Sequence, residues 1–143
     1  MTQRTGQCLC GAVRVAGDFE DGIMACHCRQ CQSWTGGSPL YTVAARGPVE
    51  VTGAEAVAAY RASTWGERGF CATCGSTLWW RMQGKPLSGV APGLFAGQDG
   101  LAVTDEIFTD CRAGWTPPFD GARQSTEAEE MAKLEAYMKG QDT

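Results

Sequence analysis

The chain has no hydrophobic run long enough to cross a membrane. No stretch of its 143 residues approaches the roughly 18 consecutive apolar residues that a spanning helix needs. Residues 1–7 are polar and do not form the apolar segment of a secretory signal. We therefore expect a cytoplasmic protein with no membrane partner, whose thiols stay reduced and do not form a disulfide framework.

Dense clusters of basic residues are also absent. The twelve Lys and Arg residues are scattered, and the formal net charge is −4. Polyphosphate partners are attracted by dense Lys and Arg surfaces, so we expect no nucleic acid partner. The chain has no internal repeat and no low-complexity linker. Its length and its 43% of hydrophobic residues are typical of one globular domain with a modest core.

Cysteine, in contrast, is abundant and clustered. Seven of the eight cysteines lie in three short motifs, Cys8-Leu-Cys10-Gly, Cys26-His-Cys28-Arg-Gln-Cys31 and Cys71-Ala-Thr-Cys74-Gly. Cysteines one or two residues apart place their sulfurs on one side of a tight turn, and they are poor disulfide partners for each other. The spacing therefore predicts metal binding, with zinc favoured because it accepts thiolates in a tetrahedral arrangement.

Short alternating segments predict a mainly β structure. Strands are expected at 12–15, 41–44, 49–52 and 106–109, with a strand end and loop at 91–100. Residues 68–70 and 77–81 flank the third cysteine motif like the arms of a hairpin. Gly11 and Gly75 suit the left-handed backbone that closes such a turn. Adjacent Trp79 and Trp80 should then point to opposite faces of one strand.

The C-terminal part has a different character. Thr126 and Glu129 match a capping box, and Met131, Leu134 and Met138 recur at helical spacing. Gly140 is expected to end this helix. The apolar stripe is expected to pack on the β domain or on a second copy of the chain, which would make a homodimer. We expect a zinc-binding β domain at 1–122 and a helical extension at 123–143.

Together these motifs resemble the glutathione-dependent formaldehyde-activating enzyme family, whose superfamily includes centromere protein V. The three cysteine motifs occur in the family's order, and further matches lie at Trp34-Thr-Gly, Tyr60-Arg-Ala-Ser, Ile107-Phe-Thr and Trp115. The matches span about residues 6 to 120. The resemblance implies a mainly β fold of short antiparallel sheets stapled by zinc, of the β-tent kind, with the C-terminal helix outside it.

The resemblance also implies two zinc sites of different kinds. It assigns Cys8, Cys10, Cys71 and Cys74 to a closed structural site with four thiolates. It assigns Cys26, Cys28 and Cys31 to a catalytic site, in which three ligands leave one coordination position for water or substrate.

Three alternatives stay open for the three-cysteine site. Cys111 or His27 could complete the ligand shell, or the three thiols could hold metal loosely. His27 follows one ligand and precedes another, so its side chain should point away from a metal that they share. A packing or hydrogen-bonding role is therefore expected for it.

The activity that the resemblance implies is that of a carbon–sulfur lyase, S-(hydroxymethyl)glutathione synthase, acting on glutathione and formaldehyde or on a related thiol–aldehyde adduct. Zinc with three thiolates carries a net charge of −1, which suits a soft thiolate substrate better than the generation of hydroxide. The alternative is a non-catalytic binding or scaffold module stabilised by zinc.

Substrate-binding residues are less sharply marked. Arginines beside the motifs could meet the carboxylates of glutathione, and tryptophans could line a binding site or the core. The arginines are Arg29, Arg61, Arg68 and Arg81, and the tryptophans are Trp34, Trp65, Trp79 and Trp80. Glu67 and Asp110 are weak candidates for a general base.

Overall fold

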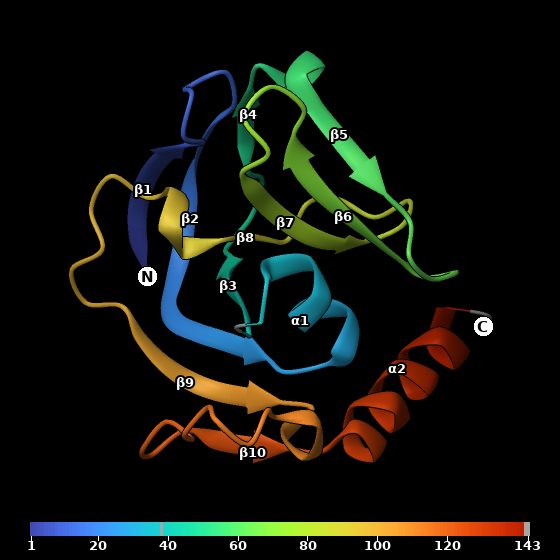
Figure 1. Cartoon of the computed structure of the whole chain (residues 1–143). Helices are drawn as coiled ribbons and strands as arrows, with labels where there is room; N and C mark the ends of the chain where they lie inside the picture. Colours follow the sequence, from blue (N-terminus) through green and yellow to red (C-terminus); the bar gives the residue numbers. More distant parts are fainter. Residues whose placement is uncertain (38, 142–143) are drawn as a thin grey trace. The chain divides into compact units, whose positions relative to one another are not determined.

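The computed structural model describes residues 1–37 and 39–141, which form ten strands and two α-helices (Figure 1). The chain divides into two compact units. The first contains Met1–Ile23 and Tyr41–Ala102, and the second contains Met24–Leu40 and Val103–Thr143. Strand β2 (Arg14–Cys26) begins in the first unit, and its last three residues belong to the second.

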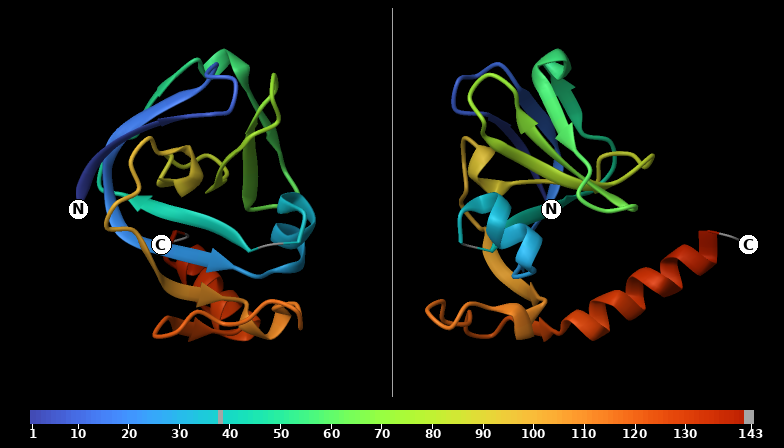
Figure 2. Two further views of the ribbon diagram at one scale, coloured as in Figure 1. Left: turned by 60° about the vertical axis from the view of Figure 1, so that its left-hand side comes forward. Right: turned by 45° about the vertical axis from the view of Figure 1, so that its right-hand side comes forward.

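The first unit holds two groups of strands. In one, β1 (Thr2–Gln7) and β4 (Glu50–Thr52) both pair antiparallel with β2, and β1 lies alongside β2 in Figures 1 and 2. Strand β3 (Leu40–Ala45) is the next neighbour of β2 and pairs antiparallel with β8 (Gly89–Val90). The short helices η1 (Ala54–Ala56) and η2 (Pro92–Leu94) lie in the connections.

The other group is a three-stranded antiparallel sheet in the order β5 (Val57–Tyr60), β6 (Gly66–Cys71) and β7 (Thr77–Met82). The predicted hairpin around the third cysteine motif is therefore confirmed. Trp79 packs over Gly69 and Trp80 over Gly66, where an added Cβ would come within 2.3 Å and 2.6 Å of the rings. Gly66 and Gly69 are three positions apart in β6, an odd separation, so the two rings lie on opposite faces of the strand, as alternation requires.

The hydrophobic core belongs to the first unit. It is made of aliphatic and aromatic side chains from both sheets together with two of the metal-motif cysteines: Cys8, Val13, Val15, Phe19, Val43, Cys71, Leu78, Trp79, Val90, Leu94 and Phe95. Because Cys8 and Cys71 are almost fully buried, the turns that carry them are anchored in the core rather than hanging from its surface.

The second unit is smaller and more polar inside. Helix α1 (Arg29–Thr35) follows the end of β2, and β9 (Ala102–Ile107) pairs in parallel with β10 (Arg123–Ser125). Along the chain, the short helix η3 (Thr109–Cys111) lies in the connection from β9 to β10. The strand predicted at 106–109 ends at Ile107, because Phe108 adopts a left-handed conformation with φ 55°.

Helix α2 (Glu127–Gln141) follows β10 directly (Figure 2). The capping box is confirmed, since Glu129 N donates to Thr126 Oγ1 (3.2 Å) and Thr126 N donates to Glu129 Oε1 (3.3 Å). The prediction that Gly140 ends the helix is wrong. Gly140 remains helical, and it is not among the glycines with positive φ. Met131 and Met138 are exposed, so packing of this stripe on a second copy stays a prediction.

The mainly β expectation is confirmed, although the sequence patterns did not reveal β1, β5, β10 or α1. None of the eight cysteines is in a disulfide bond in the structure. Among the described residues, neither the length nor the hydropathy of any helix suffices for a membrane crossing.

Candidate metal centres

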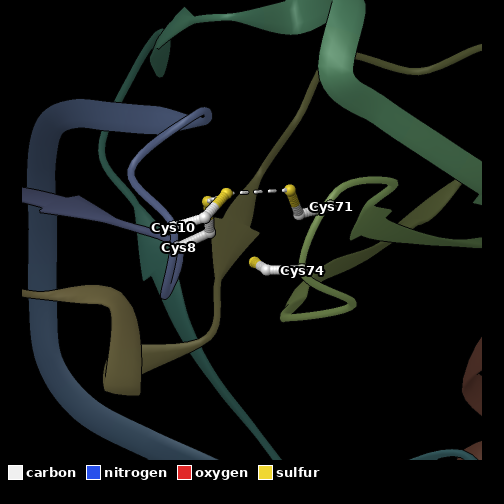
Figure 3. Close-up of side chains that lie close together, drawn as sticks. All are labelled: Cys8, Cys10, Cys71 and Cys74. Carbon is white, nitrogen blue, oxygen red and sulfur yellow. Dashed lines mark hydrogen bonds between the residues drawn. The ribbon is translucent and has the colours of Figure 1, made fainter.

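The first cysteine cluster lies within the first unit. The Sγ atoms of Cys8, Cys10, Cys71 and Cys74 all lie within 4.8 Å of one another and face a common point (Figure 3). Sγ of Cys10 is 3.7 Å from that of Cys8 and 3.8 Å from that of Cys71. Sulfurs bound at about 2.3 Å in a tetrahedron are about 3.8 Å apart. The donor set therefore fits a tetrahedral metal ion.

Each pair of cysteines is carried by a tight turn. Cys8 O accepts from Gly11 N (3.0 Å), and Cys71 O accepts from Gly75 N (2.8 Å). Both glycines have a positive φ, 80° at Gly11 and 78° at Gly75, as predicted. The glycines thus allow the backbone to fold back on itself while both sulfurs of a pair point to the same side.

Ser76 joins the two turns, a role that the sequence analysis did not foresee. Its Oγ accepts from Leu9 N (3.0 Å) and lies 3.1 Å from Sγ of Cys74. The hydroxyl is the main reason why the pKa of Cys74 falls to about 5. A serine two residues after the last cysteine was the only signal of this contact in the sequence.

Without a cation, ionisation of all four thiols would place four negative charges close together. At Cys10, the backbone of Ala12 lowers the pKa, but burial and the neighbouring thiols Cys74 and Cys8 outweigh it and raise the pKa to about 11. Thiolates held this close repel one another. A divalent ion at their centre would remove the conflict, which is a second way in which these residues fit a bound metal.

The second cluster lies within the second unit. The Sγ atoms of Cys26, Cys28 and Cys31 also lie within 4.8 Å of one another. Cys26 ends β2, Cys28 is the N-cap of α1, and Cys31 is buried in that helix. Cys31 N donates to Sγ of Cys28 (3.3 Å), and proximity to Cys28 and Cys31 strongly raises the pKa of Cys26. These three sulfurs could hold one metal ion and leave a tetrahedral position free.

Neither alternative fourth ligand belongs to this cluster. His27 is buried, and its Nε2 lies 2.8 Å from Oε1 of Glu106, which confirms the expected hydrogen-bonding role. Sγ of Cys111 lies 3.8 Å from Oε2 of Glu127. Among the described residues, the sulfur cluster contains the three motif cysteines alone.

The candidate substrate residues differ in their surroundings. Arg29 is exposed on α1, whereas Arg68 is buried in β6. Arg61 and Arg81 both donate to Glu67 through Nε. Trp79 is a core residue, and Trp34, Trp65 and Trp80 are half-buried.

Both candidates for a general base, Glu67 and Asp110, form ion pairs or hydrogen bonds with other residues of the protein. Arg81 and Arg61 hold the pKa of Glu67 below its usual range, so this carboxylate is a poor proton acceptor. Asp110 Oδ1 accepts from Glu127 N (2.9 Å) at the start of α2. Glu106 is the carboxylate that the sequence analysis missed. The one sign of it in the sequence is that this acidic residue directly precedes the apolar Ile107 and Phe108.

Comparison with known proteins decides the family. The model of the glutathione-dependent formaldehyde-activating enzyme family matches residues 3–111. The chain belongs to this family. All seven motif cysteines lie in the matched region, and α2 lies beyond it, as the resemblance implied.

Two relatives extend the comparison. The chain is 30% identical to an uncharacterized lyase of Schizosaccharomyces pombe over 112 residues, which cover 77% of this chain and 81% of the yeast protein. It also resembles the crystal structure of a Rhodobacter sphaeroides protein, with a TM-score of 0.53 and 23% identity over 85% of this chain and 99% of the other. The second likeness concerns the fold alone.

Proposed function

We propose that this member of the glutathione-dependent formaldehyde-activating enzyme family is a zinc-dependent carbon–sulfur lyase. Its substrates would be glutathione and formaldehyde, or a related thiol–aldehyde adduct, as for S-(hydroxymethyl)glutathione synthase. The family's description and the naming of the yeast relative as a lyase support this class. The observation that carries the proposal is the cluster of Cys26, Cys28 and Cys31, which has three sulfurs rather than four.

In this proposal the two clusters have different tasks. Cys8, Cys10, Cys71 and Cys74 bind a structural zinc, because four thiolates complete its tetrahedron. Cys26, Cys28 and Cys31 bind a catalytic zinc, which supplies one open coordination position and lowers the pKa of a thiol placed there. Thiolate ligands require a reducing environment, so we place the enzyme in the cytoplasm.

The reaction forms one bond between the thiol sulfur and the aldehyde carbon, and the thiol proton ends on the aldehyde oxygen. The protein's own contribution is to hold the three sulfurs on one side, so that a fourth sulfur can approach from the other. Cys31 N supports this arrangement by donating to Sγ of Cys28. Holding both reactants together would add an entropic advantage over the reaction in solution.

The decisive test compares Cys28→Ser with Cys111→Ser. Exchange between free and adduct-bound formaldehyde can be followed by NMR above the uncatalysed background, with zinc counted per chain. We expect C28S to lose one zinc and at least about 90% of the catalysed exchange, because two thiolates hold the metal poorly. C111S should keep both. Full turnover by C28S would refute the proposal.

A binding or scaffold role is the other outcome of the same measurements. Two zinc ions per chain, one of them perturbed by added glutathione, would support the enzyme. One zinc per chain, whatever the glutathione concentration, would favour the scaffold.

A further inference from the structure

His27 lies between the proposed catalytic ligands Cys26 and Cys28, and hydrogen bonds hold both its backbone and its side chain. His27 N donates to Ile107 O (3.0 Å), and His27 O accepts from Gln32 Nε2 (2.7 Å). His27 is 1% exposed, and its Nε2 donates to Oε1 of Glu106 (2.8 Å). Each of these hydrogen bonds restrains the backbone that joins Cys26 to Cys28.

The partner of this histidine is itself fixed. Glu106 is completely buried, and its two oxygens accept four hydrogen bonds. Oε1 accepts from His27 and from Arg112 Nη2 (3.1 Å), while Oε2 accepts from Gln124 Nε2 (2.6 Å) and from Phe119 N (3.0 Å). A buried carboxylate is tolerated only when it is paired in this way. Its position is therefore set by several segments of the second unit at once.

The backbone near Glu106 is also specialised. The chain turns at Phe108, the single non-glycine residue with a positive φ among those described, and this turn precedes η3 and Arg112. Left-handed backbone at a non-glycine residue is unfavourable, and it persists only where the surroundings enforce it. After this turn, Arg112, which follows Glu106 by six residues, donates to the Glu106 carboxylate.

Gln32 anchors the same segment from helix α1. Its Nε2 donates both to His27 O and to Cys111 O (2.8 Å), and Gln32 directly follows Cys31. The segment from Cys26 to Cys28 is thus tied to the helix that carries the third sulfur. Polar contacts therefore connect the backbone segments that carry the three cysteines.

We propose that Glu106 is a positioning residue of the three-cysteine site: through His27 it fixes the backbone between Cys26 and Cys28, so that three sulfurs converge before a metal arrives. The inference rests on the proposed metal-binding role of these cysteines. This role explains why a carboxylate occupies a buried position. A buried ion pair stabilises a protein little compared with well-packed apolar residues, but it can specify one geometry.

The test uses Glu106→Gln, with Glu67→Gln as the matched control. Glu67 is also a buried, ion-paired carboxylate, but it pairs with Arg61 and Arg81 in the first unit. Glutamine keeps the size of Glu106 but loses the charge and one acceptor oxygen. Zinc affinity at each site would be measured by competition with a chelator, and cadmium-113 NMR of the substituted protein would report the two sulfur environments separately.

We expect E106Q to weaken metal binding at the three-cysteine site roughly tenfold, at the lower end of outer-shell effects, because Glu106 acts through His27. The cadmium signal of this site should shift or broaden, while that of the four-cysteine site stays unchanged. E67Q should leave both signals and both affinities as in the wild type. If E106Q does not fold, Glu106→Asp keeps the charge but withdraws the carboxylate by one methylene, and the same selective loss is expected.

Three results would overturn the inference. E106Q could lower the thermal stability while both sites bind metal as in the wild type, which would make Glu106 merely structural. Both sites could lose affinity equally, which would indicate general destabilisation. Finally, the wild type could bind no metal at the three cysteines, and then the proposed function would fail with it. The wild-type metal count separates this last result from the first two.

Discussion

The Sγ atoms of Cys10 and Cys71 lie 3.8 Å apart, although 61 residues separate these cysteines along the chain. Closing such a loop costs entropy that rises only slowly with its length, by about 0.6 kcal/mol for each doubling. Structural zinc contributes about 10–16 kcal/mol in small zinc-folded peptides. A metal at this site would therefore outweigh the cost of closure and would stabilise the core of the first unit.

Replacement of Cys71 should accordingly destabilise the protein strongly. Cys71 is fully buried and supplies one of four sulfurs, so Cys71→Ser should cost several kcal/mol and lower the Tm by roughly 10 °C or more. Differential scanning calorimetry with zinc counting would measure both effects. Cys111→Ser is the control, and we expect a change of less than about 1 kcal/mol. A stable C71S protein with full zinc content would contradict the structural role of this cluster.

Metal removal should proceed in two stages. Three sulfurs would leave a bound ion open to solvent and to competing ligands, whereas four sulfurs would enclose it. A graded chelator titration should first remove one zinc with little change in circular dichroism. The second zinc should leave together with the β-sheet signal. Simultaneous loss of both ions would show that the sites do not differ as proposed.

Glu106 should make stability depend on pH in the acidic range. Burial raises the pKa of this carboxyl, but hydrogen bonds from Gln124, Phe119, His27 and Arg112 outweigh it and lower the pKa to about 2, from an ordinary value of 4.5. Because the folded value is the lower one, the stabilisation is present above about pH 4.5 and is lost as the pH falls towards 2.

The measurement compares urea unfolding of the wild type and E106Q at a series of pH values with excess zinc. The difference in unfolding free energy should be constant from pH 7 to about 5 and should shrink below that. Zinc is counted in both proteins at each pH, and the difference is taken only where their metal contents are equal, because E106Q is expected to bind zinc more weakly. If the difference in unfolding free energy between the wild type and E106Q stays constant to pH 3, or widens, Glu106 is not held in its ionised form.

The contact between Trp79 and Gly69 predicts a strong effect of one added methyl group. A Cβ on Gly69 would lie 2.3 Å from Nε1 of Trp79, which is buried and has little room to move. We expect Gly69→Ala to cost about 1–3 kcal/mol and to lower the Tm by roughly 3–10 °C. Gly93→Ala is the control, since nothing lies within 4 Å of that position. Equal melting temperatures for the two variants would disprove the close packing of this ring.

The local features of the metal sites could be predicted from the sequence because they depend on neighbours along the chain. Cysteines two or three positions apart meet around one turn, and glycines after Cys10 and Cys74 allow that turn to close. The capping box at Thr126 could be predicted for the same reason. Helix α1 was missed because only seven residues form it, too few for a periodic pattern.

Longer-range relationships were beyond the residue patterns. The assignment of Cys8 and Cys10 to the same site as Cys71 and Cys74 came from the family resemblance, since spacing alone does not say which turns meet. The partners of His27 could not be inferred at all. Glu106 lies 79 residues away, and its burial depends on the register of β9 and on the turn at Phe108.

The spacing and periodicity of nearby residues were enough to predict that cysteines group in two pairs and one triplet suited to metal binding, and that strands dominate. The family resemblance implied which turns share a site, and the folded chain brings their sulfurs together, whereas the carboxylate that contacts His27 is seen in the folded chain alone. These contacts join segments distant in the chain, and their formation depends on the packing and hydrogen bonding of each unit as a whole.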